Sequence, residues 1–347
     1  VYPYRKAGPT VEKINGKLNA PAAPKIGVAK PKVIIPVFPG TNCEYDTAQA
    51  CLRAGIDPQI VVIRNLTRDA LAQSAQALEA AIFEEMKRDE KIYYMGEDVG
   101  VFGGAITKLF SLYQNFPDRV MDMPLDEKGF TGIAVGMAWM GLRPIVEFMY
   151  PDFLPLAMSD IAHGAAKQYW LSNQKDPVPM IIRSAQGIGS QCGAHHSECV
   201  EGWVMNYPGL KIAVPTFPED AYGMMKYAIR DNDPVIWLDC RTTCYTEHAD
   251  IPEEAEDALI PFGHARIRRE GSDVTIVAWH KLLKDALAAA DDLEKQGISC
   301  EVIDPRTLIP FDIDTVLASV RKTGRLVIAH EANIRGGFGA GIAAQVT

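Results

Sequence analysis

The sequence predicts an α/β protein in which a doubly wound parallel-sheet domain is followed by a smaller α/β domain. Three observations support this fold class. Short apolar segments suited to strands alternate with segments of helical periodicity, turn-forming residues separate them, and polar side chains follow several of the strands. Such alternation is typical of parallel sheets covered by helices, whose functional groups gather at the carboxyl ends of the strands.

The composition is that of a globular protein and narrows the range of functions. The chain has 347 residues, of which 48% are hydrophobic and 23% charged, and its formal net charge is -9. An acidic chain lacks the basic surface expected of a nucleic-acid-binding protein, and no apolar run has the length of a membrane span. The odd number of cysteines, 7, and the lack of a signal-peptide core favour free thiols in a reducing compartment.

The N-terminal part of the chain differs in character from the rest. Residues 1–30 are rich in Pro, Lys, Gly and Ala without periodicity, which predicts a flexible arm. Residues 31–70 contain two apolar runs, Val33–Phe38 and Ile60–Ile63, on either side of a helical stretch. This pattern predicts one βαβ unit, which is too small to bury a core by itself.

One motif in this unit, Val37-Phe-Pro-Gly-Thr-Asn-Cys43-Glu44, carries a resemblance of its own. Residues 32–67 resemble the start of the glutamine amidotransferase domain of formylglycinamidine ribonucleotide synthase. The glycine-flanked cysteine elbow that this class uses does not follow in the sequence. We therefore interpret Cys43 as a buried small residue rather than a nucleophile, and residues 31–70 as a partial domain joined to a different protein.

Residues 71–245 are expected to form the parallel-sheet domain. Its predicted elements are a helix Ala77–Arg88, a strand Lys91–Met95, a helix after Pro124, a strand Pro144–Tyr150, a helix Met158–Trp170, a strand Val178–Arg183, a strand Leu210–Val214, a helix ending at Arg230 and a strand Pro234–Asp239. Thr216 and Glu219 have the spacing of a capping box at the start of the helix that ends at Arg230.

The acidic, proline-containing stretch 246–262 predicts a linker to a second domain, residues 263–347. The elements predicted for that domain are a strand Val274–Trp279, a helix Leu282–Gln296, and strands Ser299–Ile303 and Leu326–His330. Because the sequence stops inside a helix that begins near Gly339, we expect this domain to be truncated.

An acidic pair before a glycine-rich helix is the most distinctive feature of the chain. Asp126 suits an N-cap, and Glu127 then lies in the first helical turn, where the helix dipole favours a carboxylate. Gly132 and Gly136 share one face of that helix, so that a backbone or a flat ligand can approach closely. From the residues alone, Glu127 is either a helix-start acid or a carboxyl in an apolar cleft that shares a proton with a bound heterocycle.

The loop 184–198 contains histidines and cysteines that allow two further functional interpretations. Cys192, His195, His196 and Cys199 are residue types that bind zinc, although ligands this close in sequence rarely surround a tetrahedral ion. His196, in a glycine-rich loop after a predicted strand, also suits proton transfer or the binding of a substrate carboxylate, and a solvated loop histidine is the simpler alternative.

Residues 71–347 contain six short motifs: Met95 to Val99, Pro124 to Phe130, Gly141 to Phe148, His196-Ser197, Ala228 to Asp231 and Val302 to Leu308. With these motifs the chain resembles the beta subunits of thiamine-diphosphate-dependent 2-oxo-acid dehydrogenases, the pyruvate dehydrogenase type above all. The resemblance implies that the first domain is a pyrimidine-binding domain and that the second is a transketolase-type C-terminal domain.

The resemblance also implies roles for individual residues. Glu127 would hydrogen-bond the aminopyrimidine ring of thiamine diphosphate, Phe153 would pack against that ring, and Glu97 would lie near the cofactor. His196 would face the reacting centre. The implied reaction is decarboxylation of a 2-oxo acid and acylation of a lipoyl group. Pyruvate is the leading substrate, and branched-chain oxo acids and acetoin stay open.

Metal sites and partners follow from the same resemblance. A monovalent-cation site, with K⁺ as the candidate, is implied at Met180, Ala228, Ile229, Asp231 and Asp233, although some relatives have asparagine at the position of Asp233. The Gly-Asp-Gly motif that binds Mg²⁺ and the diphosphate is missing from the sequence. We therefore expect an alpha subunit that completes an α2β2 heterotetramer on a lipoyl acyltransferase core, in a bacterial cytoplasm or an organelle matrix.

Two alternatives stay open at this point. The chain could be a non-catalytic remnant of a fused and truncated gene that still binds its partner subunit. It could also be a fragment of a purine-pathway glutamine amidotransferase, which would require Cys43 to act as a nucleophile.

Overall fold

The computed structural model describes residues 32–37, 44–54, 57–62, 68–104, 109–187, 193–241 and 258–347. Within the chain, Val1–Ile63 and Arg64–Thr347 form two compact units, and each is described by itself. The predictions made for the N-terminal arm, for Cys43 and Cys192, and for most of the linker fall outside the described residues.

The first unit contains the predicted βαβ arrangement. β1 (Lys32–Val37) and β2 (Asp57–Val62) are parallel, paired from Lys32 opposite Asp57 to Val37 opposite Val62. The helix α1 (Glu44–Arg53) lies between them in sequence and contacts both strands. The strand–helix–strand prediction for residues 31–70 is therefore confirmed.

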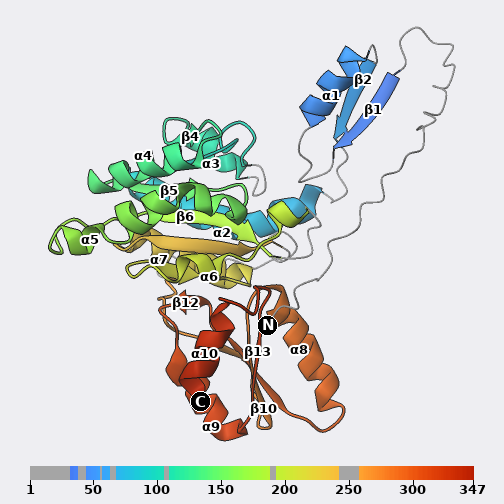
Figure 1. The fold of residues 1–347 in the computed structure, drawn as a ribbon, viewed down its shortest axis with the longest axis vertical. Coiled ribbons are helices and arrows are strands. Elements are labelled where there is room, and N and C mark those ends of the chain that lie inside the picture. Colours follow the sequence, from blue (N-terminus) through green and yellow to red (C-terminus); the bar gives the residue numbers. More distant parts are fainter. Residues whose placement is uncertain are drawn as a thin grey trace, which may run out of the picture. The chain divides into compact units, whose positions relative to one another are not determined.

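The second unit is built on a seven-stranded sheet with the order β12-β7-β8-β6-β5-β3-β4 (Figure 1). Six of the strands are parallel to one another: β3 (Ile92–Gly96), β4 (Val120–Asp122), β5 (Arg143–Glu147), β6 (Ile181–Gln186), β7 (Lys211–Ala213) and β8 (Val235–Cys240). Every residue of β6 and β8 is buried, as expected for central strands of a sheet that is covered on both faces. The prediction of a doubly wound parallel sheet is confirmed.

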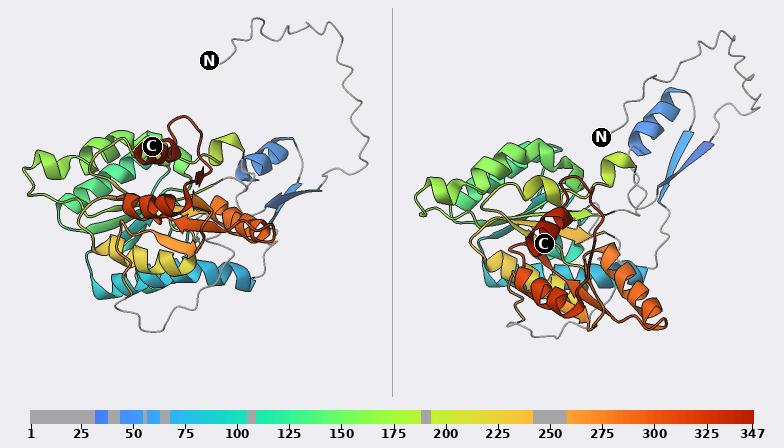
Figure 2. Two further views of the ribbon diagram at one scale, coloured as in Figure 1. Left: turned by 90° about the horizontal axis from the view of Figure 1, so that it is seen from below. Right: turned by 60° about the horizontal axis from the view of Figure 1, so that its bottom comes forward.

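Helices form a layer on each face of this sheet (Figure 2). The helices α2 (Arg68–Arg88), α3 (Phe110–Asn115) and α7 (Pro218–Arg230) share one hydrophobic core with the strands. The opposite face is covered by α4 (Glu127–Trp139), the 3₁₀ turn η1 (Pro151–Ala157), the π turn η2 (Asp160–Ala165) and α6 (Glu201–Val204). This second core continues into residues of the C-terminal region, such as Trp279 and Phe338.

Two local predictions were wrong. The single helix predicted for Met158–Trp170 is interrupted by the π turn η2, and only α5 (Gln168–Leu171) follows it as an α-helix. A Cβ atom at Gly164 in this turn would lie 3.1 Å from Val135 Cγ1, which shows how closely η2 packs on α4. The capping box at Thr216 does not form either, because its Oγ1 accepts a hydrogen bond from His280 N at 2.9 Å instead.

The C-terminal region adds a four-stranded sheet with the order β13-β10-β11-β9. Its elements are β9 (Arg266–Arg269), β10 (Val274–Ala278), α8 (Lys281–Glu294), β11 (Cys300–Asp304), α9 (Ile313–Thr323), β13 (Leu326–Ala329) and α10 (Phe338–Val346). The sequence did not indicate β9 or α9. It also did not indicate that β12 (Thr307–Ile309) leaves this region and pairs antiparallel with β7, which joins the two sheets through one strand.

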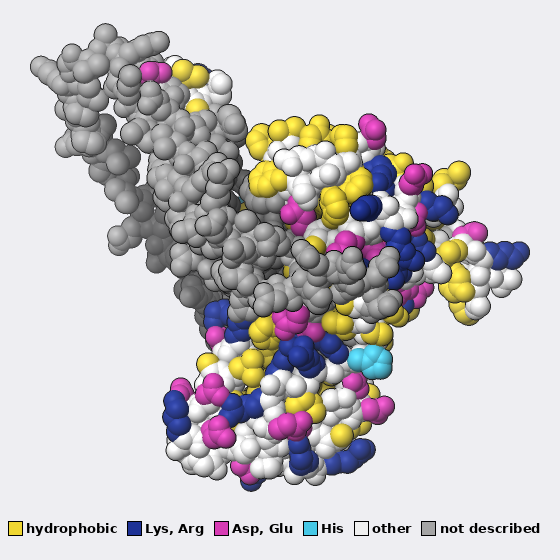
Figure 3. All heavy atoms as spheres, turned by 180° about the vertical axis from the view of Figure 1, so that it is seen from behind, with side chains coloured by type: hydrophobic (Ala, Val, Ile, Leu, Met, Phe, Trp, Pro, Cys, Tyr) yellow, Lys and Arg dark blue, Asp and Glu magenta, His cyan; other side chains and the backbone are white. Residues whose placement is uncertain are grey.

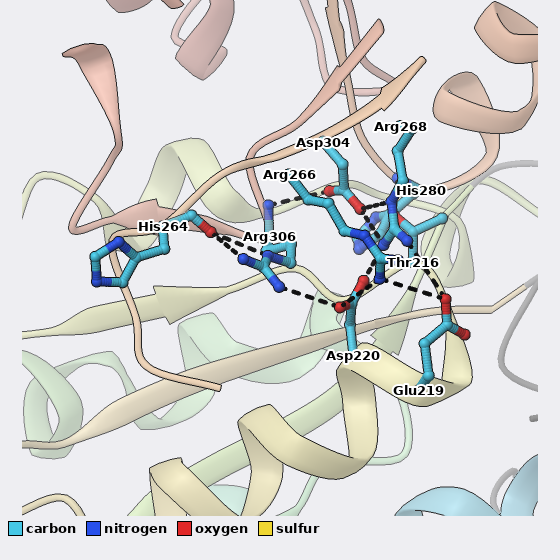
Figure 4. A network of polar contacts seen from close by, with 9 residues as sticks. All are labelled: Thr216, Glu219, Asp220, His264, Arg266, Arg268, His280, Asp304 and Arg306. Atoms are coloured by element: carbon cyan, nitrogen blue, oxygen red, sulfur yellow. Dashed lines mark hydrogen bonds and ion pairs between the residues drawn. The ribbon is translucent and has the colours of Figure 1, made fainter. Parts of the chain in front are cut away.

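A network of buried charges connects the C-terminal region to α7 (Figure 4). Arg268 on β9 donates from Nη2 to Asp304 Oδ2 at 2.8 Å and also to Asp220 Oδ2 on α7. Arg306 donates from Nη1 to Asp220 Oδ1 at 3.2 Å. Neither Asp220 nor Asp304 is exposed, and the Arg268 guanidinium lies over the Phe217 ring. Each buried carboxylate in this network therefore has a cationic partner.

The surface of the C-terminal region carries acidic and basic side chains side by side, as the lower half of Figure 3 shows. In contrast, α5 projects from the body of the protein with Trp170 and Leu171 largely exposed (Figures 1 and 3). Among the described residues, no helix combines the length and the apolarity that a membrane span requires.

Candidate active site

Two glutamates lie at the rim formed by the carboxyl ends of the strands. Glu97 directly follows β3, and Glu127 is the first residue of α4. The helix begins where the sequence predicts, because the side chain of Asp126 accepts a hydrogen bond from Gly129 N at 3.0 Å. Both glutamates are buried, with exposed fractions of 4% for Glu97 and 8% for Glu127.

The electrostatic environment of Glu97 is unusual for a surface loop. Burial raises its pKa to about 7, and the negative charges of Glu127 and Asp98 act in the same direction. Both carboxyl oxygens of Glu97 are buried and have no hydrogen-bond partner among the described residues. An unsatisfied buried polar group costs roughly 1–3 kcal/mol, so that a ligand with hydrogen-bonding groups would stabilise this position.

The hydroxyl of Thr131 is a second unpartnered group in this neighbourhood. It lies one turn beyond Glu127 on α4, is fully buried, and has no hydrogen-bond partner among the residues described. Sequence reasoning did not single it out. The signal was a polar residue in an otherwise apolar and glycine-rich helix.

Three rings form a second group of side chains at the same rim. The His196 and Tyr150 rings are stacked, with centroids 4.0 Å apart and an interplanar angle of 6°. Phe153 meets His196 edge to face at 5.5 Å, and meets Tyr150 in the same way at 6.0 Å. Sequence reasoning singled out Phe153 and His196 but missed Tyr150.

The topology explains why these groups lie at one edge. β3, which precedes Glu97, pairs directly with β5, which precedes Tyr150 and Phe153. β5 in turn pairs with β6, which leads into the loop that carries His196. Parallel strands end at the same edge of their sheet, so that the acidic pair and the three rings belong to one rim.

The residues predicted to hold a monovalent cation also lie near one another, at the opposite ends of the strands. The Met180 carbonyl oxygen accepts a hydrogen bond from Val235 N at 2.9 Å. The Ala228 carbonyl oxygen accepts one from Asp231 N at 3.2 Å. These contacts tie the end of α7 to the starts of β6 and β8.

Two positively charged side chains already bind the remaining oxygens of this set. Arg143 Nη1 donates to the carbonyl oxygens of Ile229 at 2.9 Å and Asp231 at 2.7 Å. Lys211 Nζ lies 2.5 Å from Asp231 Oδ2 and 3.0 Å from Asp233 Oδ2. Partial burial lowers the pKa of Lys211, but these two hydrogen bonds outweigh it and raise the pKa above its ordinary value. A potassium ion would compete with these two side chains for the same oxygens, and the cation site stays a prediction.

The zinc hypothesis gains no support from the described residues. Burial raises the pKa of the Cys199 thiol far above its ordinary value, so that the thiolate that binds zinc is disfavoured. In the part of the chain that the structure describes, no group of three or more His, Cys, Asp or Glu side chains could hold a metal ion. Cys192, the other thiol of the motif, lies outside that part.

Comparisons with protein families divide the chain in three. Residues 72–244 match the family described as "Transketolase, pyrimidine binding domain", and residues 263–347 match "Transketolase, C-terminal domain". Residues 30–83 match "CobB/CobQ-like glutamine amidotransferase domain", which agrees with the resemblance seen for residues 32–67.

Individual proteins similar to the chain point in the same direction. The rice protein named pyruvate dehydrogenase E1 component subunit beta-2, mitochondrial, is 45% identical over 274 residues, which is 78% of this chain and 73% of the relative. The corresponding subunit of Rickettsia felis is 45% identical over 78% of this chain and 82% of its own length. A solved structure named "Split gene transketolase, inactive beta4 tetramer" matches with a TM-score of 0.64 and 25% identity, over 78% of this chain and 83% of that one.

Proposed function

Because the chain belongs to the family of beta subunits of the pyruvate dehydrogenase E1 component, we propose that it forms one half of a thiamine-diphosphate site that decarboxylates pyruvate. The proposal includes the division into a pyrimidine-binding domain at 71–245, a linker at 246–262 and a transketolase-type domain at 263–347. The observation that carries it is the buried, unpartnered carboxyl group of Glu97 beside Glu127.

The acidic pair fits an aminopyrimidine ring. Such a ring presents a ring nitrogen and an amino group, which require a proton donor and an acceptor. Glu127 would hold the ring nitrogen and share its proton. Glu97, with a pKa of about 7, would lie beside it and offer the carboxyl oxygens that have no partner among the described residues. The face of Phe153 would support the flat ring.

His196 would act on the substrate side of the same rim. When bound, thiamine diphosphate supplies the nucleophile that attacks the 2-oxo group and takes up the electrons left after carbon dioxide departs. The His196 imidazole would hold the substrate carboxylate or carry a proton during transfer of the acyl group to a lipoyl group. The rings of Tyr150 and Phe153 pack against the imidazole and would shield that side of the site from water.

The proposal requires partner proteins. The alpha subunit would bring Mg²⁺ and hold the diphosphate in an α2β2 heterotetramer, which would bind a lipoyl acyltransferase core. Exposed apolar side chains on α4 and α5, among them Ile133, Trp139 and Trp170, support subunit contacts at these helices. The solved structure named "Split gene transketolase, inactive beta4 tetramer" supports a need for a second kind of chain. We include neither potassium nor the amidotransferase activity, and we place the complex in a bacterial cytoplasm or an organelle matrix.

Reconstitution tests the proposal. The chain would be co-expressed with a pyruvate dehydrogenase alpha subunit and assayed with thiamine diphosphate and Mg²⁺ for pyruvate-dependent reduction of a dye, and then for acylation of a lipoyl domain. We expect Glu127→Gln to lower kcat by at least about 100-fold because it cannot share the ring proton, while assembly is kept.

The matched control is Glu90→Gln, which removes an exposed carboxylate of the same length. It should leave kcat unchanged. Full activity of the Glu127→Gln complex would remove this residue from the mechanism. Assembly without any turnover of the unchanged chain would instead favour a subunit-binding remnant.

A further inference from the structure

We propose that Tyr150 and Arg241 are positioning residues that fix the His196 imidazole in one orientation and one tautomer. The proposal rests on the function inferred for His196, but its structural part can be tested without turnover. Neither residue was singled out by the sequence. All three side chains are buried, with exposed fractions of 2% for Tyr150 and 8% each for His196 and Arg241.

The first constraint on His196 is the stack on Tyr150. Ring planes 6° apart with centroids at 4.0 Å restrict rotation of the imidazole, because any turn about its χ angles breaks the parallel contact. The edge-to-face contact with Phe153 at 5.5 Å blocks movement within the plane of the stack. Ring pairs prefer offset-stacked and edge-to-face arrangements of this kind, so that both contacts favour one orientation of the imidazole.

The second constraint sets the tautomer. His196 Nδ1 lies 2.5 Å from the carbonyl oxygen of His195. A carbonyl oxygen only accepts hydrogen bonds, so that this contact favours the neutral tautomer with its hydrogen on Nδ1. Nε2 is then the ring atom that accepts a proton, which defines the atom through which His196 would act.

Arg241 binds both parts of this arrangement with one guanidinium group. Its Cζ atom lies 4.9 Å from the centroid of the Tyr150 ring, and its Nη1 donates to the carbonyl oxygen of His196 at 2.6 Å. Nη2 and Nε donate to the Ala185 carbonyl oxygen at the end of β6, at 2.6 and 3.2 Å. Arg241 therefore holds the ring on which the imidazole stacks, the backbone that carries the imidazole, and the sheet.

Lysine could not reproduce these contacts. An ammonium group lacks the planar fork of donors that reaches two carbonyl oxygens while it lies over a ring. The stack on His196 uses the face of the Tyr150 ring, which phenylalanine also has, so that phenylalanine should preserve the orientation of the imidazole. These two expectations separate positioning from a general effect on folding.

The experiment compares Tyr150→Phe, Tyr150→Leu and Arg241→Lys in the assembled enzyme and in the full chain. We expect Tyr150→Phe to keep kcat within about threefold, and the other two variants to lower kcat by about 10- to 100-fold with little change in KM. In the full chain labelled with ¹⁵N-histidine, long-range ¹⁵N–¹H spectra should show one His196 tautomer, hydrogen on Nδ1, for the unchanged chain and Tyr150→Phe. Tyr150→Leu and Arg241→Lys should show a mixture of the two His196 tautomers. Urea unfolding of the same variants should show that both are folded.

A single unchanged tautomer in both disruptive variants would overturn the proposal, as would an equal loss of kcat in Tyr150→Phe. If Tyr150→Leu fails to fold, Arg241→Lys decides alone. If the complex with the unsubstituted chain is inactive but the variants show the expected change of tautomer, the proposed function is contradicted and the positioning role is supported.

Discussion

Two buried acidic clusters in this chain have opposite relations to their surroundings. Asp220 and Asp304, between α7 and the C-terminal sheet, are bound by Arg268. Glu97, at the rim of the first sheet, lies beside a second carboxylate, and its own oxygens have no partner among the described residues. Both clusters are buried, yet only the first has its charge balanced within the described chain.

The contrast separates a structural role from a functional one. Buried polar groups in folded proteins are nearly always hydrogen-bonded, so that the balanced cluster needs no ligand to explain it. A carboxyl that is buried, unpartnered and shifted in pKa has a cost that a bound molecule can remove, and such groups concentrate at active sites. Removal of a cation from the first cluster should therefore destabilise the chain, whereas removal of the Glu97 charge should stabilise it.

The largest effect should come from the balanced cluster. Arg268→Met removes the guanidinium that lies over Phe217, leaves Asp304 without that partner and removes one of the cations bound to Asp220. We expect the free energy of unfolding to fall by about 3–5 kcal/mol, because an uncompensated buried charge remains. Urea unfolding followed by tryptophan fluorescence would measure it.

The neighbouring residue provides the control. Arg269 binds Asp291 and Glu294 on the surface, where water and salt screen ion pairs, and Arg269→Met should lower the free energy of unfolding far less than Arg268→Met does. Equal losses of stability in Arg268→Met and Arg269→Met would show that burial does not make the Arg268 network more important for stability than a surface ion pair.

The unbalanced cluster should respond in the opposite direction. In the free chain, Glu97→Gln should stabilise the fold at about pH 8 by on the order of 1–3 kcal/mol, since it removes an unpaired buried charge. The pKa of Glu97 is raised to about 7 in the folded chain, so that folding favours its protonated form. Its contribution to stability is therefore fully present below the ordinary carboxyl pKa and is lost as the pH rises toward 7.

The difference between Glu97→Gln and the unchanged chain should consequently vanish at about pH 4.5 and grow up to about pH 8. Urea unfolding at a series of pH values gives this profile. Glu90→Gln, at an exposed position, should show no such trend. Destabilisation by Glu97→Gln at high pH would mean that the carboxylate has a partner after all.

The smallest effect concerns Asp231 and Asp233, which Lys211 already binds. Exchange of lithium for potassium chloride at equal ionic strength should move the melting midpoint of the chain by less than about 1 °C, because the fixed ammonium group occupies these carboxylates. Differential scanning calorimetry would detect the shift. In Lys211→Met the carboxylates lose their cation, and potassium should then stabilise the chain. A potassium-specific rise of several degrees in the unchanged chain would restore the cation site expected from the sequence.

The sequence predicted the features that depend on interactions between residues close together in the chain. An aspartate before an apolar run predicted the N-cap at Asp126, and the alternation of strands and helices predicted the parallel sheet. The same topology placed Glu97, Phe153 and His196 at one rim, since each follows a strand that ends there.

The features that were missed depend on contacts between distant residues. Thr216 has the spacing of a capping residue, but it binds His280, which lies 64 positions later. Arg241 reaches His196 across 45 positions, and β12 crosses from one sheet to the other. No pattern within a short window carries such information, so that the positioning of the imidazole became visible only in the structure.

The central claim is that Glu127 shares a proton with the aminopyrimidine of thiamine diphosphate. The most direct measurement is exchange of the thiazolium C2 proton into heavy water in the assembled complex, stopped by acid and read by ¹H NMR, for the unchanged chain and for Glu127→Gln. We predict exchange at least about 100-fold slower in Glu127→Gln, with the cofactor still bound. Equal exchange rates in the two complexes would contradict the account.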